Sequence, residues 1–241
     1  QMLGGDAIVS SDQPTPPTFV ERAHALGLAT ATMANFPSMG RAPDAKGDTI
    51  YNGAQDNGTG IGAVLELARM YAAGPKPQRS VVFAFWTAEE KGLIGSEYYA
   101  SNPVYPLETT VAGFNIDALS VLGRAHDVSV IGSGQSDLEA RLQTYLAGHN
   151  RVMRADPSPE AGYFYRSDHF PMAKRGVPML YMDSGIDLLN GGVAAGTAAD
   201  NAYRKDQYHQ PADEYDPSWD LSGRVQDLVI AFDLGRELSN S

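Results

Sequence analysis

The sequence predicts an α/β protein, a three-layer α/β/α sandwich built around a mainly parallel mixed sheet. Continuous apolar runs typical of buried strands, such as Ser80–Trp86, alternate with segments such as Ile61–Tyr71, in which apolar residues recur at helical spacing. Strands that alternate with helices favour a sheet covered by helices on both faces. Because no internal repeat or low-complexity tract interrupts the pattern, we treat residues 1–241 as a single domain.

In the first part of the chain, proline and glycine separate short elements. Pro16 and Pro17 predict a turn after the first strand, and Gly27 ends a short helix. The expected elements are a strand at Asp6–Ser11, a turn at 12–18, a helix at Phe19–Leu26, a loop at 34–52, a helix at Ile61–Tyr71 and a strand at Ser80–Trp86.

In the second part, the alternation continues until a Gly- and Ala-rich stretch, Gly185–Asp206, whose composition predicts a second long loop. The expected elements are helices at Gly92–Ala100, Ser136–Gly148 and Leu221–Leu238, and strands at Thr110–Ile116, Val128–Gly132 and Gly176–Tyr181.

Composition narrows the class of partner. The formal net charge of −11, with lysine and arginine scattered, argues against nucleic acid or an acidic membrane as a partner. The absence of cysteine excludes disulfides, zinc ribbons and thiol nucleophiles. No apolar run is long enough for a membrane span. We expect a secreted or periplasmic chain, although its N-terminus shows no signal peptide.

Acidic side chains follow the predicted strands, where ligands bind in α/β sheets. Glu89 and Glu90 come after Ser80–Trp86, Asp117 ends the next strand, and Asp56 precedes the helix at Ile61–Tyr71. His209, at the end of the second long loop, adds an imidazole. Carboxylates and imidazole are ligands that zinc takes in proteins.

The adjacent glutamates Glu89 and Glu90 repel each other unless a cation offsets their charge. With a divalent ion present, one can bind the ion while the other acts as general base on a water whose pKa the ion lowers. The alternative is that the pair begins a surface helix, where acidic residues favour the positive end of the helix dipole. The further acidic residues Asp56 and Asp117, near the ends of other elements, favour a metal centre over this alternative.

Five short segments carry a further signal: 52–60 (NGAQDNGTG), 87–92 (TAEEKG), 115–117 (NID), 167–170 (SDHF) and 208–213 (YHQPAD). In this order, over about residues 40–240, they resemble the zinc exopeptidase family of bacterial leucyl aminopeptidases, glutamate carboxypeptidases and glutaminyl cyclases. The chain looks most similar to the bacterial aminopeptidase branch. The resemblance implies a single catalytic domain, two zinc ions and a peptide or aminoacyl substrate.

The resemblance also implies a role for each matching residue. The implied metal ligands are Asp56, which bridges the two ions, Glu90 and His209, which bind one of them, and Asp117, which binds the other. The other implied roles belong to Glu89 as general base, Tyr165 as donor to the oxyanion, and Asp168 and His169 as neighbours that orient ligands and substrate. For Tyr165, packing in a pocket or core is an equal alternative.

The chain departs from the family before the bridging aspartate. The family's His-x-Asp motif, whose histidine binds the zinc that Asp117 shares, falls here on Asn35 and Pro37. Asparagine is a poor zinc ligand, so 1–39 looks atypical or shortened. Three explanations stay open: His24 replaces the ligand, only one ion is bound, or the N-terminal stretch is altered relative to a natural parent.

Three functions are therefore weighed. The first is a zinc aminopeptidase in which Glu89 activates water and returns the proton to the departing amine. The second is a single-zinc aminoacyltransferase of the glutaminyl cyclase type, which needs only Asp56, Glu90 and His209. The third is a degenerate binding domain with an impaired metal site. The segment 87–92 favours the first.

Overall fold

The computed structural model describes residues 3–10 and 43–241. The predicted turn at 12–18, the predicted helix at Phe19–Leu26 and the predicted ligand position Asn35 therefore lie outside the described residues. The helices are α2 (Gly58–Ala73), α3 (Ile94–Ser101), α4 (Leu138–Gly148), α5 (Phe170–Ala173), α6 (Gly192–Asp206) and α7 (Ser222–Leu238). The strands are β1 (Leu3–Ser10), β2 (Ser80–Thr87), β3 (Gly113–Ile116), β4 (Asp127–Val130), β5 (Val152–Ala155) and β6 (Met179–Ser184).

The strands form one sheet in the order β2-β1-β3-β6-β4-β5. β3 pairs with β6, and β4 with β5, in parallel. β1 runs antiparallel to both β2 and β3, and β4 runs antiparallel to β6. The prediction of a mixed sheet is confirmed, but its parallel part is smaller than predicted, because β1 is inserted antiparallel between β2 and β3.

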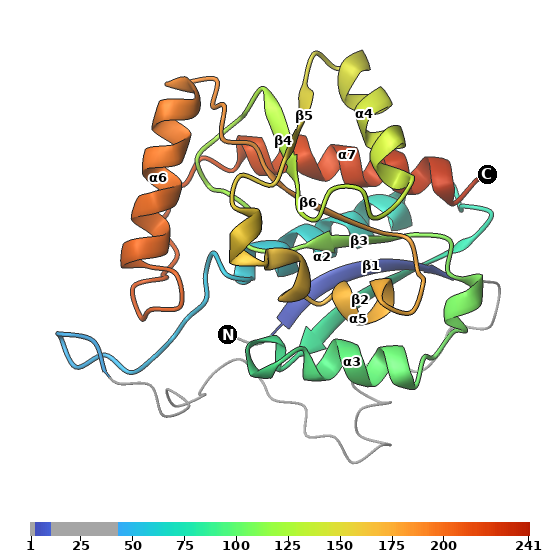
Figure 1. Cartoon of the computed structure of the whole chain (residues 1–241), viewed down its shortest axis with the longest axis horizontal. Helices are drawn as coiled ribbons and strands as arrows, with labels where there is room; N and C mark the ends of the chain where they lie inside the picture. The colour runs from blue at the N-terminus through green and yellow to red at the C-terminus, as the bar shows by residue number, and fades with distance from the viewer. Residues whose placement is uncertain (1–2, 11–42) are drawn as a thin grey trace.

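Helices cover both faces of the sheet, as the sequence predicts (Figure 1). On one face, α2, α4 and α7 pack their apolar sides against β3, β4 and β6 in a core that includes Val64, Leu142, Phe114, Val128 and Leu234. On the other face, Trp86, Ala100, Met172 and Met179 form a smaller core under α3 and α5. Removing this apolar surface from water stabilises the layers at roughly 25 cal/mol per Å².

Three predictions about individual elements need correction. The stretch Gly185–Asp206 contains the helix α6 rather than a loop alone. The strand at Ser80–Trp86 is not buried on both faces: Trp86 is buried, and the rest is half-buried because β2 lies at the sheet edge. The short strand β5 and the one-turn helix α5 were not anticipated. No helix in the described part of the chain is long and apolar enough to cross a membrane.

Candidate metal centre

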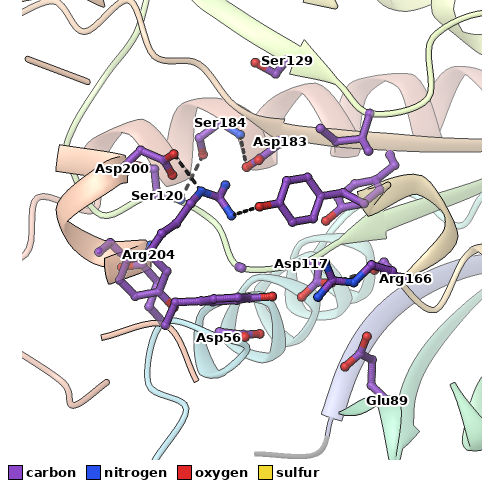
Figure 2. A pocket seen from close by; sticks show the side chains of 18 of the residues that line it. Asp56, Glu89, Asp117, Ser120, Ser129, Arg166, Asp183, Ser184, Asp200 and Arg204 are labelled. Carbon is purple, nitrogen blue, oxygen red and sulfur yellow. Dashed lines mark hydrogen bonds and ion pairs between the residues drawn. The ribbon is translucent and has the colours of Figure 1, made fainter. Parts of the chain in front are cut away.

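A cavity of about 510 Å³ opens where β2, β3 and β6 end. Asp56, Glu89, Glu90, Asp117 and His209 all line it, so the structure brings together the residues that the sequence predicts for the reaction centre. Figure 2 shows Asp56, Glu89 and Asp117 pointing into the same space from different elements. The position at the strand ends is the one expected for a ligand site in an α/β sheet.

Asp56 lies in the turn that leads into α2. The next residue, Asn57, is the N-cap of α2, where its Oδ1 accepts the Gly60 N–H at 2.8 Å. The same side chain accepts the Ala118 N–H at 3.1 Å and donates to the Ile116 carbonyl at 3.2 Å. Asn57 thereby ties the turn that carries Asp56 to the end of β3, close to Asp117.

Glu89 and Glu90 begin a single 3₁₀ turn, Glu89–Lys91, directly after β2. Ala88, between the strand and this turn, has a φ of 59°, in the left-handed region. A non-glycine residue there carries strain that the surrounding structure must offset, and such residues cluster at functional sites. The sharp turn lets the two carboxylates leave the strand end in different directions.

His209 completes a three-ligand cluster. Its Nε2 lies 2.9 Å from Asp56 Oδ2 and 2.9 Å from Glu90 Oε1. The candidate ligand atoms of these three residues all lie within 4.8 Å of one another. His209 also has a left-handed φ of 57°, so a second constrained backbone position directs a ligand into the cluster.

The donor set of this cluster fits zinc. Two carboxylate oxygens and one imidazole nitrogen are ordinary zinc ligands, and three protein ligands leave a fourth position for water or substrate. Ligand atoms of a tetrahedral zinc ion lie about 3.3 Å apart, given bonds of about 2.0–2.1 Å. The observed 2.9 Å contacts of His209 would therefore need to open by only a few tenths of an ångström.

A proton on His209 stabilises the cluster in the metal-free protein. Burial disfavours the imidazolium, but hydrogen bonds to Asp56 and Glu90 favour it and raise the pKa of His209 to about 9. At neutral pH the imidazolium thus supplies positive charge between two carboxylates. A divalent ion would take over that role and require the neutral imidazole.

Two further carboxyl groups in the cavity have raised pKa values. Burial, together with the charges of Asp117 and other nearby carboxylates, raises the pKa of Glu89 to about 9. Burial and the charge of Asp56 raise the pKa of Asp117 to about 7, against a hydrogen bond from Ser167. The raised pKa values reflect several carboxylates close together, whose repulsion the His209 imidazolium offsets only in part. A metal ion would relieve this repulsion further.

Asp117 is held by a short hydrogen-bond chain. The Ser167 hydroxyl donates to Asp117 Oδ2 at 2.6 Å, and Asn115 Nδ2 donates to the Ser167 oxygen at 2.7 Å. Ser167 and Asn115 are both buried, so the chain fixes the carboxylate from the interior. Asp117 is not part of the three-ligand cluster among the described residues.

Asp168 and His169 follow Ser167 and are both buried. Asp168 Oδ1 accepts the Ser96 hydroxyl at 2.6 Å, and its charge contributes to the raised pKa of Glu89. The His169 ring packs edge-on against Phe164 and Tyr181, and burial lowers its pKa to about 3. Neither ring nitrogen has a hydrogen-bond partner among the described residues, so the contact that would orient a ligand is not found there.

Two tyrosines line the cavity near the cluster. Tyr165, the predicted oxyanion donor, lies at the cavity wall with 63% of its surface exposed. Tyr208, which sequence reasoning missed, stacks on His209 with 3.8 Å between ring centroids, and burial raises its pKa. Its position directly before His209 in the sequence could have indicated it, because a residue next to a candidate ligand lies in the same loop and near the same cavity.

Similarity in sequence to known proteins identifies the family to which the chain belongs. Residues 31–233 match the family described as Peptidase family M28. The Leupeptin-inactivating enzyme 1 of Streptomyces exfoliatus is 32% identical over 144 residues, which are 58% of this chain and 31% of that protein. An aminopeptidase of Pseudomonas aeruginosa is 26% identical over 216 residues, 76% of this chain and 39% of that protein. The chain thus spans between about 31% and 39% of the length of these relatives.

Solved structures agree on the fold. The LapA aminopeptidase of Legionella pneumophila superimposes with a TM-score of 0.57 at 17% identity, covering 80% of this chain and 48% of that one. An aminopeptidase from Aneurinibacillus sp. strain AM-1 gives a TM-score of 0.51 at 19% identity, covering 83% of this chain and 47% of that one. Since the family match extends over most of the chain and the fold is shared, the chain belongs to Peptidase family M28.

Proposed function

We propose that this chain is a zinc-dependent aminopeptidase that hydrolyses the N-terminal peptide bond of its substrate. The convergence of Asp56, Glu90 and His209 within 4.8 Å, with Glu89 beside them, is the observation that carries the proposal. Membership of Peptidase family M28 and similarity to aminopeptidases support the same reaction class.

Asp56, Glu90 and His209 would hold the zinc ion. When bound, zinc supplies Lewis-acid polarisation of the substrate carbonyl and lowers the pKa of a bound water. Asp213 holds the backbone next to the Asp56 ligand in place, because its carboxylate accepts the backbone N–H groups of Gln55 at 2.8 Å and Asp56 at 3.0 Å. This support fixes the turn from which the Asp56 side chain projects.

Glu89 is the general base in this proposal. It lines the same cavity as the ligands but is absent from the three-ligand cluster, so its carboxylate is available for proton transfer. With the positive charge of zinc nearby, its pKa falls below the value of about 9 that it has in the metal-free cavity. Glu89 takes a proton from the attacking water and delivers it to the departing amine.

A tyrosine hydroxyl completes the proposed machinery by donating to the oxyanion that develops on the carbonyl. Tyr165 is the residue that the resemblance implies, and Tyr208 is the one that lies against a ligand. Both line the cavity. Asp117 would belong to a second ion, whose remaining ligand position at Asn35 is outside the described residues.

A single-zinc aminoacyltransferase is the second candidate. The observation that favours it is the cluster itself, which joins Asp56, Glu90 and His209 and leaves Asp117 hydrogen-bonded to Ser167. Incubation with a peptide that begins with glutamine and with an aminoacyl anilide separates the two functions, because only the transferase cyclises the glutamine.

Glu89→Gln tests the aminopeptidase proposal. Glutamine has nearly the same shape but cannot accept a proton, so we expect the variant to bind zinc like the parent and to lose at least about 10²-fold in kcat. Elemental analysis gives the zinc content, and hydrolysis of an aminoacyl anilide gives the rate. Glu160→Gln, a change on the 3₁₀ turn Pro159–Ala161 outside the cavity lining, is the control. Turnover close to that of the parent would overturn the role of Glu89.

A further inference from the structure

The cavity extends beyond the metal cluster into a second compartment, which we name the Asp183 chamber. Its walls come from the end of β6, from α6, from β4, from the chain after β3 and from the 3₁₀ turn Tyr163–Tyr165. In Figure 2, Asp183, Ser184, Ser129, Asp200 and Arg204 lie on one side of the cavity, and Asp56 and Glu89 lie on the other. The residues named as the chamber are Ser120, Ser129, Tyr163, Asp183, Ser184 and Arg204.

The direction of the proposed reaction determines which part of the substrate enters this chamber. Glu89 must be within hydrogen-bond reach of the departing amine to protonate it. The leaving group therefore lies on the Glu89 side of the carbonyl, and the N-terminal residue lies on the opposite side. That opposite side is where Figure 2 shows Asp183 and Ser184, beyond Asp117.

The chamber is polar, and the Asp183 carboxylate has no cationic group in direct contact among the described residues, although Arg204 acts on it through space. The Arg204 guanidinium already has two hydrogen-bond partners: its Nε donates to Asp200 at 2.8 Å, and its Nη1 donates to the Tyr163 hydroxyl at 2.6 Å. Asp183 Oδ1 accepts the backbone N–H of Ser184 at 2.7 Å. Within the described part of the chain, no lysine, arginine or histidine nitrogen lies within 4.0 Å of the Asp183 carboxylate.

A carboxylate in this position is costly unless a ligand offsets its charge. Burial, above all, raises the pKa of Asp183 to about 7, although the side chain still borders the cavity. An apolar side chain in the chamber would cover this carboxylate and leave its charge without a compensating contact. A cationic side chain would neutralise Asp183 and donate hydrogen bonds to its carboxylate.

We propose that the Asp183 chamber binds the side chain of the substrate's N-terminal residue and selects a lysine- or arginine-like cation, with Asp183 as its counter-ion. The inference rests on the aminopeptidase function proposed above and names its substrate class. Arg204 acts on Asp183 through space and lowers its pKa, but Asp200, to which Arg204 is hydrogen-bonded, raises it. Two carboxylates thus face one guanidinium, and the chamber keeps a net negative charge.

Three anilides test this selection on the zinc-loaded full chain: lysyl, norleucyl and glutamyl anilide. Norleucine has the aliphatic part of lysine without the ammonium group, so the pair isolates the charge. We expect kcat/KM for the lysyl substrate to exceed that for norleucyl by at least about tenfold, the scale of one good charge-assisted contact. A ratio at or below one, or faster hydrolysis of the glutamyl substrate, would overturn the proposal without any variant being made.

Asp183→Asn then tests the named residue. The substitution keeps the shape and removes the charge, and we expect the lysyl-to-norleucyl ratio of kcat/KM to fall toward one. Asp206→Asn, on the exposed C-terminal turn of helix α6, removes a carboxylate outside the cavity and should leave the ratio intact. An unchanged ratio in Asp183→Asn would overturn the role of Asp183.

Failure of this inference can be told apart from failure of the proposed function. Hydrolysis of all three anilides without preference for lysine would leave an aminopeptidase whose chamber does not select a cation. A zinc-loaded chain that hydrolyses none of them would contradict the aminopeptidase function itself.

Discussion

The carboxylate of Asp213 accepts the backbone N–H of Asp56 at 3.0 Å, and so links the loops that carry two of the proposed metal ligands, Asp56 and His209. Asp213 is buried and lies four residues after His209. It also accepts the Gln55 N–H at 2.8 Å, and its backbone carbonyl accepts the Ala54 N–H at 3.1 Å. Contacts outside the cluster thus hold the loops of Asp56 and His209 together, in addition to the direct contact between the two side chains.

Asp213→Ala is expected to weaken zinc binding without removing any ligand. The buried N–H of Gln55 and the partly buried N–H of Asp56 would lose their acceptor, and the turn at Asp56 would lose its support. We expect zinc affinity to fall by about 10–100-fold, the usual effect of losing a group that orients a ligand. Titration against a competing zinc chelator measures it.

Asp213→Asn separates a positioning role from a general structural one. The asparagine oxygen can accept one of the two N–H groups, but its amide would face the other with a second donor. Zinc affinity intermediate between the parent and the alanine variant supports positioning. Glu214→Gln, a change at the exposed neighbour whose side chain accepts from Asn52 at 3.3 Å, is the control. Equal loss in all three variants would contradict the assignment.

Zinc binding is expected to release about one proton from His209 at neutral pH. The pKa of this imidazole in the metal-free protein is about 9, so it is protonated at pH 7, whereas a ligand must be neutral. Zinc affinity should therefore rise with pH up to about pH 9. Above that pH, the titration of His209 should raise it no further. Calorimetric titrations in buffers of different ionisation enthalpy count the protons released, and because Glu89 also has a raised pKa, the Glu89→Gln variant isolates the part that comes from His209.

The same shift predicts how the metal-free protein responds to pH. Because the folded pKa of His209 is raised above the ordinary value of 6.5, its contribution to stability is complete below about pH 6.5. That contribution disappears as the pH rises through about 9. Denaturant unfolding of the metal-free parent and of His209→Gln should thus differ more at pH 6 than at pH 9.5, and an equal difference at both would contradict the prediction.

The two cavity tyrosines are expected to differ in their effect on turnover. Tyr208 stacks on His209 and is held in the cavity, whereas Tyr165 is mostly exposed. A hydroxyl fixed before the reaction stabilises the oxyanion better than a mobile one. We expect Tyr208→Phe to lower kcat by roughly 10²-fold with little change in KM. Tyr165→Phe should lower kcat less. If anilide hydrolysis instead shows the larger loss of kcat in Tyr165→Phe, Tyr165 is the oxyanion donor.

Much of the candidate site could be predicted because its residues follow strands. Glu90 and Asp117 come directly after apolar runs, and an α/β sheet brings such strand ends together. The hydrogen bond between Asp213 and Asp56 could not be predicted in the same way, because it joins two loops far apart in the sequence. Asp183 was missed because it belongs to the last residues of a buried strand, where the pattern indicates only packing.

The helix α6 was missed for a physical reason. Gly196 is its buried residue, and a Cβ there would come within 2.1 Å of the Ile186 carbonyl oxygen. A helix that approaches backbone through glycine and buries little apolar surface has no strong helical periodicity. His169 shows the same limit for a single residue, since burial between Phe164 and Tyr181 cannot be seen from its neighbours in sequence.

A secreted or periplasmic location stays a prediction.

The three ligands of the proposed zinc site enter from distant parts of the chain: Asp56 before α2, Glu90 after β2, and His209 after α6. An ion bound by all three would act as a cross-link that closes two long loops. In the unfolded chain such closure costs entropy that grows slowly with loop length, so an ion that binds only the folded state favours folding. Metal supply would then govern the lifetime of the folded chain as well as its chemistry.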